Sequence, residues 1–297
     1  MKTVIRDMTR VDVPRVGELL FEAFSSSASR HGYAPRLQTL QEATSWAWAI
    51  LRHGRGDHLL VAEVAGRTVG ICCLNERGRF GGIGPVAVAP AFQGQGVGRQ
   101  LMRVILERAE GLQSVRLFQE AFNVASFSMY YSMGFMPVAD LLDLSAAARP
   151  QGAPPISGRV DELRCDELDS LESYDHQRSG VSRRRDLEYF LKWGKVFVQG
   201  RGSDIRGFLA CLPAAQSVQF GPLVADGEEE AILLYHKAAA AFREKACQTR
   251  VMARNRALVE SLQSQGFRLY CLNLLMVRGS WRPGKSVGAF GRFPEGL

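Results

Sequence analysis

The sequence predicts an α/β fold (α+β) of two tandem domains, each a mixed, mostly antiparallel sheet flanked by helices. Three observations support this prediction. Helical and strand-like apolar periods alternate along residues 1–148. A stretch that contains prolines and lacks apolar periodicity follows, which marks 149–157 as a linker. Features of the first part then recur in the same order over 158–297, which indicates a duplicated domain.

The first domain has a regular alternation of elements. In chain order we expect strand 4–8, helices 12–24 and 37–51, strands 58–64, 68–75 and 83–88, a helix from 97, strand 115–121, a helix within 123–134 and strand 135–144. The last strand is expected to complete the sheet of this domain.

The second half repeats a strand and the helix that follows it. Ile83-Gly-Pro-Val-Ala-Val88 returns as Phe220-Gly-Pro-Leu-Val-Ala225, and the next elements are a helix expected over 227–247 and a strand over 250–255. An Asn precedes a Gly-Phe pair by eleven residues in both copies: Asn123 with Gly134, and Asn255 with Gly266. Marks that coincide in the same order favour duplication over chance similarity.

Composition excludes several classes of protein. Hydrophobic residues make up 46 % and charged residues 23 % of the 297 residues, as in soluble globular proteins. The N-terminus lacks the apolar run of a signal peptide, and no stretch reaches the roughly 18 apolar residues of a membrane span. We therefore expect a cytoplasmic protein with no membrane partner.

Cysteine and histidine usage predicts no metal site. The six cysteines are scattered, and the one close pair, Cys72-Cys73, lies in an apolar strand-like run, so we expect reduced, buried thiols. The five histidines are isolated from one another in the sequence. Neither a metal site nor a Cys–His nucleophile has support.

The net charge of +7 suits a ligand that carries phosphates. The sharpest basic run, Arg183 to Arg185, has no interleaved aromatic residues, so we interpret it as a solvated helix start rather than a nucleic-acid contact.

The segment Gln93 to Arg99, Gln-Gly-Gln-Gly-Val-Gly-Arg, joins a strand to a helix. Such a loop leaves backbone N–H groups unpaired at the positive end of the helix dipole, which favours a bound pyrophosphate. The dinucleotide fingerprint does not fit, because the glycines fall at 94, 96 and 98 and no acidic residue stands on a following strand.

A second phosphate-binding pattern fails on its context. Gly279 to Ser286 matches the Walker A expression, but only eleven residues follow, with no helix to cradle a phosphate and no strand to supply a magnesium-binding aspartate. Nucleotide hydrolysis is therefore not expected.

The loop after the strand reads (Gln/Arg)-x-x-Gly-x-(Gly/Ala) and resembles the acetyl-CoA loop of the GNAT superfamily of N-acetyltransferases. The resemblance implies a fold with a strand–loop–helix core, and acetyl-CoA as cosubstrate. The implied cofactor-binding residues are Val86, Ala87, Val88, Gln93, Gly94, Gln95, Gly96, Val97, Gly98, Arg99 and Asn123.

Residues Asn123 to Phe135 are similar to the Asn…Phe-Tyr-x-x-Gly-Phe segment of that superfamily. The resemblance implies that Asn123 bonds the pantetheine arm and that Tyr131 protonates the leaving thiolate, whereas Tyr130 is interpreted as a core aromatic. Many members have a glutamate as the base for the acceptor amine where Ile83-Gly84-Pro85 stands in this chain. Glu120 is the first candidate and Glu76 the second; a surface carboxylate is the alternative interpretation of either.

The second copy lacks these features. Asp226-Gly-Glu-Glu-Glu-Ala231 replaces the glycine loop, and its carboxylates would repel a pyrophosphate. Gln263 stands in the place of Tyr131. We expect a catalytic domain over 1–148, a degenerate domain over 158–297 that helps to shape the acceptor pocket, and one acetyl-CoA per chain.

The implied reaction is acetyl transfer from acetyl-CoA to a primary amine by direct attack. A small molecule or amino-acid-like acceptor is the first candidate, and a protein lysine or N-terminus the second. A non-catalytic acyl-CoA-binding module is the remaining alternative. Acceptor specificity is expected to come from 24–36, with Ser25, Ser26, Ser27 and His31.

Overall fold

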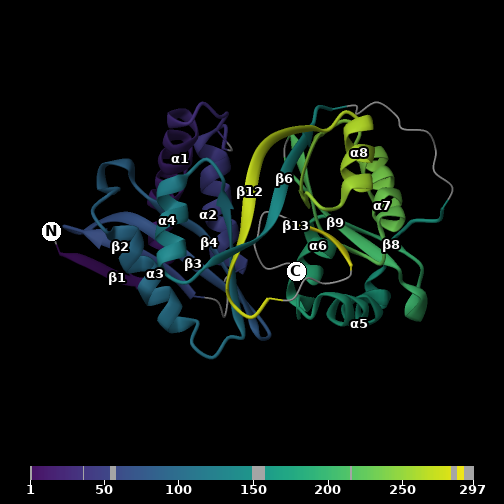
Figure 1. Cartoon of the computed structure of the whole chain (residues 1–297), viewed down its shortest axis with the longest axis horizontal. Coiled ribbons are helices and arrows are strands. Elements are labelled where there is room, and N and C mark those ends of the chain that lie inside the picture. Colours follow the sequence, from purple (N-terminus) through teal and green to yellow (C-terminus); the bar gives the residue numbers. More distant parts are fainter. Residues whose placement is uncertain are drawn as a thin grey trace. The chain divides into compact units, whose positions relative to one another are not determined.

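The computed structural model describes residues 2–35, 37–53, 58–148, 158–214, 216–281 and 286–290 (Figure 1). The chain forms two compact units. Unit 1 comprises Met1–Met136 with Val277–Gly279, and unit 2 comprises Pro137–Met276 with Ser280–Leu297. The predicted linker, 149–157, lies outside the described residues, and the boundaries at 148 and 158 stay a prediction.

Unit 1 has a sheet of strand order β1-β2-β3-β4-β5, antiparallel except for the parallel pair β4–β5. Its elements are β1 Thr3–Asp7, α1 Val13–Arg30, α2 Leu40–His53, β2 His58–Val64, β3 Arg67–Arg77, β4 Phe80–Val88, α3 Val97–Arg108, β5 Ser114–Glu120 and α4 Val124–Ser132.

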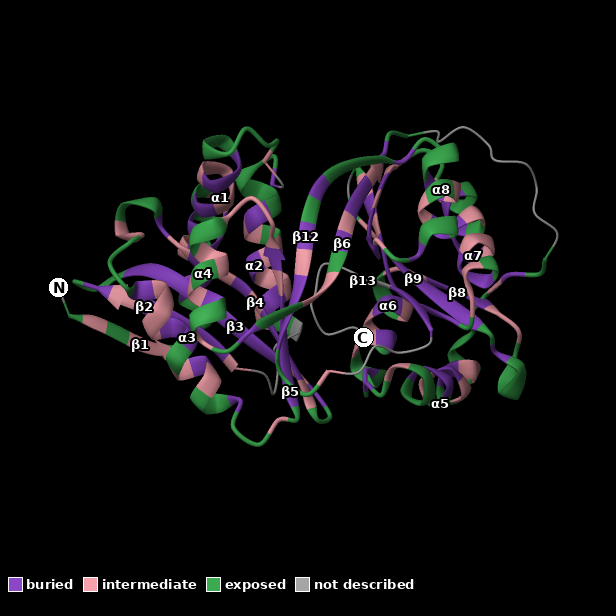
Figure 2. Ribbon diagram, in the orientation of Figure 1, coloured by how far each residue is buried: buried purple, intermediate pink, exposed green. Residues whose placement is uncertain are grey.

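Helices cover both faces of this sheet, which is why its strands are buried along most of their length (Figure 2). Ile71 and Cys73 of β3 pack in one core with the apolar faces of α1 and α2. Cys72 lies between them in sequence and points to the opposite face, where its Sγ is 3.9 Å from Sδ of Met102 on α3.

Helix α1 is longer than predicted, since it runs to Arg30 rather than to residue 24. Its apolar stripe continues past the predicted end, because Ser27 and Ala28 are buried in the last turns. The serines of the expected specificity segment are therefore helical, and Arg36 of that segment lies outside the described residues.

The prediction that the strand over 135–144 completes the sheet of the first domain was wrong. This strand, β6, spans Met136–Ala146. It pairs antiparallel with β11 in unit 2, from Ala146 opposite Cys247 to Leu141 opposite Met252. The buried carboxylate of Asp143 accepts two hydrogen bonds from Arg250, at 2.5 and 2.7 Å. A buried charge needs such a partner, so this pair fixes β6 beside β11.

Unit 2 repeats the parallel pair, here β10 and β11, and continues to an edge in the order β10-β9-β8-β7. The last three residues of β12 belong to unit 1. In chain order, the elements after β6 are β7 Asp161–Glu162, α5 Leu168–Ser179, α6 Arg184–Trp193, β8 Lys195–Gln199, β9 Gly207–Pro213, β10 Ser217–Ala225, α7 Glu228–Ala241, β11 Ala246–Met252, α8 Arg256–Ser264, β12 Arg268–Gly279 and β13 Val287–Phe290. The helix predicted over 227–247 thus ends at Ala241, and the strand predicted over 250–255 begins and ends earlier.

Two predictions about single residues need correction. Arg183 of the basic run is not solvated: it is buried, and its Nε lies 2.6 Å from Oδ2 of the buried Asp175. Cys165 is exposed, whereas the other five cysteines are buried, and all six are free thiols.

Candidate functional site

A cavity of about 830 Å³ opens in unit 1 where β4 and β5 part. The two strands pair only from Phe80 opposite Ser114 to Ile83 opposite Leu117. The rest of β4, including Val86 to Val88, keeps its partner β3 on one side and lines the cavity on the other. The splayed end of a parallel pair therefore forms the cleft.

Two backbone N–H groups of β4 point into this cleft. The N–H of Ala89 donates to Val69 O at 2.8 Å, toward β3. Because N–H groups alternate along a strand, those of Val86 and Val88 point the opposite way. These two N–H groups can therefore donate hydrogen bonds to a carbonyl oxygen of a ligand in the cleft.

The glycine loop forms the second wall. Gly94 and Gly96 have φ of 75° and 83°, a region that favours glycine, and Gly96 is the N-cap of α3. Within the described part of the chain, no hydrogen bond is recorded for the backbone N–H groups from Gly94 to Arg99. These N–H groups, at the positive end of the α3 dipole, are the chemistry that binds a pyrophosphate.

The loop is tied to its surroundings through Gln93. Its Nε2 donates to Val88 O at 2.8 Å, and its Oε1 accepts from Nη2 of Arg30 at 2.8 Å. Arg30 also lines the cavity, as does Arg99, whose Nη1 donates to Ser132 Oγ at 3.0 Å. The guanidinium groups of Arg30 and Arg99 thus add positive charge near the N-terminus of α3. Sequence reasoning missed Arg30, because it comes from the last turn of α1.

Asn123 is the N-cap of α4 and lines the cavity. Its Oδ1 accepts from Ser126 N at 3.1 Å, which satisfies one of the open N–H groups of the first turn. Among the described residues no partner is recorded for its Nδ2. The amide N–H₂ is therefore available as a donor in the cleft.

The structure places every predicted cofactor-binding residue on the cavity wall except Gln95. The side chain of Gln95 bonds back to its own loop, with Nε2 donating to Ala91 O at 2.9 Å.

Tyr130 is buried, as expected of a core aromatic, but it is this tyrosine rather than Tyr131 that faces the cavity. Tyr130 lines the cavity and is 6 % exposed, whereas Tyr131 is 51 % exposed, is absent from the wall and stacks on Phe127. Asn123, Ser126 and Tyr130 recur at i, i+3 and i+7, so one face of α4 presents all three to the cleft. This helical phase is the sequence signal that separates the two tyrosines.

The phenol of Tyr130 keeps its proton to high pH. Burial is the main cause that raises its pKa, and the nearby Cys72 and Glu120 add to it. Glu120 itself lines the cavity at the end of β5, close enough to act on the phenol electrostatically. Glu76, the second candidate base, is not on the wall; it lies 3.2 Å from Nε2 of His58.

The end of α1 supplies a further part of the cavity wall. Phe24, Ser27 and His31 of the expected specificity segment lie on the wall. His31 Nδ1 is 2.8 Å from Ser27 O, and its ring packs on Phe122, with centroids 5.0 Å apart. The wall near Glu120 is therefore largely aromatic.

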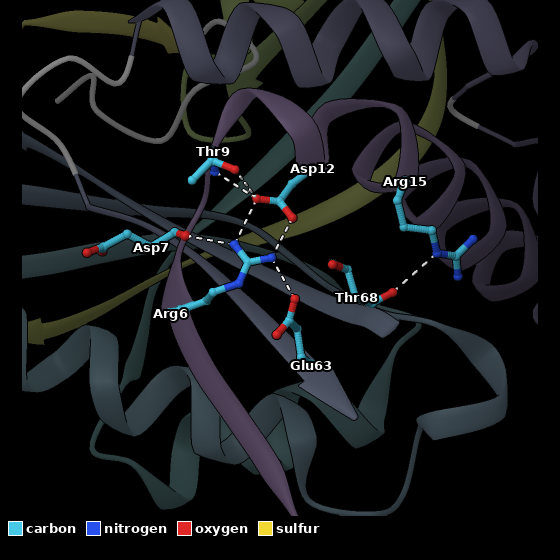
Figure 3. Close-up of polar contacts among 7 residues, drawn as sticks. All are labelled: Arg6, Asp7, Thr9, Asp12, Arg15, Glu63 and Thr68. Atoms are coloured by element: carbon cyan, nitrogen blue, oxygen red, sulfur yellow. Dashed lines mark hydrogen bonds and ion pairs between the residues drawn. The ribbon is translucent and has the colours of Figure 1, made fainter. Parts of the chain in front are cut away.

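An ion-pair network anchors the other end of α1 (Figure 3). Arg6 on β1 bonds both carboxylate oxygens of Asp12, at 2.8 and 2.7 Å, and Glu63 on β2 at 2.6 Å. Asp12 also accepts from the backbone and the hydroxyl of Thr9, both at 2.8 Å. These bonds hold the start of α1 on the sheet, and so they fix the direction in which its last turn meets the cavity.

The described residues offer neither a metal site nor a membrane-spanning helix. No group of three or more His, Cys, Asp or Glu side chains there is arranged to hold a metal ion. No helix in the same residues is long and apolar enough to cross a membrane. Gly284 and Lys285 of the rejected Walker A match lie outside the described part of the chain.

Comparison with known proteins identifies the family of both units. Residues 14–135 match the acetyltransferase (GNAT) family, and residues 171–291 match an acetyltransferase (GNAT) domain. The fold is shared with a Pyrococcus horikoshii protein assigned as an acetyltransferase (TM-score 0.75, 19 % identity, 94 % of this chain and 90 % of that one). It is also shared with a GCN5-related N-acetyltransferase from Sphaerobacter thermophilus (TM-score 0.64, 15 % identity, 96 % of each chain).

Two curated relatives match shorter stretches. The uncharacterized N-acetyltransferase YobR of Bacillus subtilis (strain 168) is 33 % identical over 63 residues, which are 20 % of this chain and 26 % of the relative. The N-alpha-acetyltransferase RimI of Mycobacterium tuberculosis is 34 % identical over 86 residues, which are 28 % of this chain and 54 % of the relative. The chain thus spans about a quarter and about half of the lengths of these relatives. From the two domain matches, the chain belongs to the GNAT acetyltransferase family and carries two such domains in tandem.

Proposed function

We propose that unit 1 is an acetyl-CoA-dependent N-acetyltransferase and that its active site is the cleft between β4 and β5. One observation supports this most directly: a single cavity joins the open N–H groups of the glycine loop to Tyr130 and Glu120. Anion-binding groups at one end and acid–base groups at the other suit a long substrate with a phosphate end and a reactive end.

The residues present fit acetyl-CoA. Backbone N–H groups of Gly94 to Gly98, with Arg30 and Arg99, would hold the pyrophosphate. The Nδ2 of Asn123 and the edge of β4 would hold the amides of the pantetheine arm. When bound, acetyl-CoA supplies the activated acetyl group as a thioester.

The side chains then divide the proton transfers. Glu120 takes a proton from the acceptor ammonium, whose pKa of about 10.4 otherwise keeps it protonated at neutral pH. The amine nitrogen bonds to the acetyl carbon as the carbon–sulfur bond breaks, and the N–H of Val86 or Val88 stabilises negative charge on the carbonyl oxygen. Tyr130, kept protonated by burial, donates to the leaving sulfur, a role that we transfer to it from Tyr131. The nitrogen loses its second proton as the amide forms, and this proton returns to the phenolate of Tyr130 through water. Glu120 releases its proton to solvent.

Unit 2 lacks both acid–base groups. In the register of the two parallel pairs, Glu120 corresponds to Met252 and Tyr130 to Leu262, and both of these side chains are buried in the core. Gln263, the counterpart of Tyr131, is equally unable to protonate a thiolate. We therefore propose one catalytic site and one acetyl-CoA per chain.

The proposed acceptor is a primary amine of a small or amino-acid-like molecule, because the wall beside Glu120 is formed by compact aromatic groups, His31 and Phe122. A protein N-terminus is the second candidate, favoured by the match to an N-alpha-acetyltransferase over 86 residues.

The test is release of free CoA thiol from acetyl-CoA, measured against a panel of small amines and of peptides with a free N-terminus. Turnover with at least one amine, together with saturation at one CoA per chain by calorimetry, is the expected result. CoA binding without turnover on any acceptor would instead favour an acyl-CoA-binding module.

A further inference from the structure

The cleft of unit 2 is filled by the chain itself. Strands β10 and β11 pair in parallel only from Ser217 opposite Ala246 to Phe220 opposite Thr249, as β4 and β5 do. Beyond that point, where unit 1 has its cavity, β13 pairs antiparallel with both strands. Its four residues, 287–290, therefore lie in the opening between them.

The residues of β10 that pair with β13 correspond to the residues of β4 that line the cavity in unit 1. Leu223, Val224 and Ala225 pair with β13, and the Gly-Pro motif aligns these three residues with Val86, Ala87 and Val88. The backbone orientation agrees as well. Asp226 N donates to Arg206 O at 2.8 Å, so the N–H groups of Leu223 and Ala225 face β13, as those of Val86 and Val88 face the cleft.

The cap asparagine of the second copy contacts the same strand. Asn255, which corresponds to Asn123, is buried, and its Nδ2 donates to Gly288 O of β13 at 3.3 Å. Its side chain does not cap α8. The donor left without a recorded partner in unit 1 thus has a main-chain carbonyl as its partner in unit 2.

In unit 2 the carboxylate of Glu228 takes over the capping bond that Asn123 makes in unit 1. Oε2 of Glu228, in the first turn of α7, accepts from Leu258 N in the first turn of α8 at 2.7 Å. In unit 1 the corresponding N–H, that of Ser126, is bonded by Asn123 itself. Glu228 therefore places a negative charge of the chain at the helix ends, where a phosphate would otherwise be favoured.

We infer that the cleft of unit 2 is a binding site for an extended amide backbone, and that β13 of the same chain is its resident ligand in place of acetyl-CoA. The inference rests on the proposed function, since it equates the cleft of unit 1 with a cofactor site. Pantetheine is an extended chain with two amides, so a β-strand offers the same donors and acceptors to the two strands and to the asparagine.

Occupation of the cleft by β13 and exclusion of CoA by charge alone lead to different binding stoichiometries. If only the three glutamates kept CoA out of unit 2, their removal would open a second site. With β13 in the cleft, the variant Glu228→Gln, Glu229→Gln, Glu230→Gln still binds one CoA, because the pantetheine position stays occupied. The Glu228→Gln change retains a side-chain oxygen that can accept from Leu258 N, so the helix contact is kept. Two equivalents of CoA per chain in this variant would overturn the inference.

Hydrogen exchange on the full chain tests the occupant directly. Without CoA, the N–H groups of Leu223 and Ala225 are expected to exchange at least tenfold more slowly than those of Val86 and Val88. CoA should slow Val86 and Val88 and leave Leu223 and Ala225 unchanged. Equal exchange at the two pairs without CoA, or slowing of Leu223 and Ala225 by CoA, would refute the role of β13. No effect of CoA on Val86 and Val88 would instead count against the proposed function alone.

Two variants link the protection to β13. Val287→Pro removes the N–H opposite Ala225, and we expect at least tenfold faster exchange at Leu223 and Ala225, whereas Val287→Ala, which keeps that N–H, should change it much less. Asn255→Ala removes only the side-chain bond and serves where the proline variant fails to fold. Unchanged exchange at Leu223 and Ala225 in Asn255→Ala would mean that the bond to Gly288 does not hold the strand.

Discussion

Arg30 and Gln93 join the last turn of α1 to the glycine loop, with Nη2 of Arg30 donating to Oε1 of Gln93 at 2.8 Å across 63 residues of sequence. Because Gln93 also bonds Val88 O, the guanidinium is held beside the open N–H groups of the loop. The contact gives α1 a direct part in the proposed phosphate site.

Arg30→Ala should weaken CoA binding through the loss of this charge. We expect a dissociation constant about tenfold higher, the scale of about 1.4 kcal/mol for a charge-assisted contact. Calorimetry with CoA and with pantetheine separates the phosphate end from the arm, and only CoA should lose affinity. Arg15→Ala is the matched control, since Arg15 is on the same helix, pairs with Glu18 and Glu22, and is not on the cavity wall. Equal losses for the two ligands would contradict the assignment of Arg30.

Gly96→Val should abolish measurable CoA binding. The new Cβ has room within the protein, but a β-branched residue at φ of 83° shifts the backbone whose N–H groups face the ligand. Gly111→Val is the control, because Gly111 also has positive φ, 93°, and open space around it, yet lies outside this cavity. Both variants should lose similar stability in thermal unfolding. Normal CoA affinity in Gly96→Val would remove the loop from the site.

Tyr130→Phe should lower kcat by about 10- to 100-fold, the lower part of the range for general acids, because a thiol of pKa near 8.5 leaves fairly well as an anion. KM for acetyl-CoA should change little. Tyr131→Phe, one residue away on the exposed face of α4, should keep full activity. A loss confined to Tyr131→Phe would restore the role predicted from the sequence.

The fold class and the tandem arrangement were predictable because they depend on local periodicity and on a repeated motif. The partner of β6 was not, since it depends on a pair, Asp143 with Arg250, that is 107 residues apart. Within the site, the glycine loop is a contiguous signal, whereas Arg30 reaches it only through the tertiary path of α1. The choice between Tyr130 and Tyr131 required the phase of α4, and the filling of the second cleft required the position of β13.

The pH dependence of kcat/KM in Glu120→Gln tests whether Glu120 is the base. An amide cannot take the proton of an acceptor ammonium, so kcat/KM at pH 7 should fall by about 10²-fold or more. The loss should shrink as the pH approaches the amine pKa of about 10.4, where the acceptor loses its proton to water. Glu76→Gln, off the cavity wall, is the control. A loss that is constant from pH 7 to 10 would mean that Glu120 acts in binding rather than as a base.

Asp12 should make the free energy of unfolding depend on pH in the acid range. The hydrogen bonds from Arg6, assisted by those from Thr9, lower the pKa of its carboxyl from 3.8 to about 2 in the folded state. A lowered folded-state pKa means that the charged form stabilises the fold above pH 4, and that this contribution is lost as the pH falls from about 4 to 2. The difference between 3.8 and about 2 corresponds to about 2.5 kcal/mol.

In urea unfolding, Asp12→Asn should be less stable than the parent by about this amount at pH 7 and should lose less stability between pH 4 and 2. Asp7→Asn, at a neighbouring exposed carboxylate, should differ little from the parent. If the parent and Asp12→Asn lost stability in parallel over this range, the carboxylate would not be the group that titrates, and the network in Figure 3 would not be what holds α1 on the sheet.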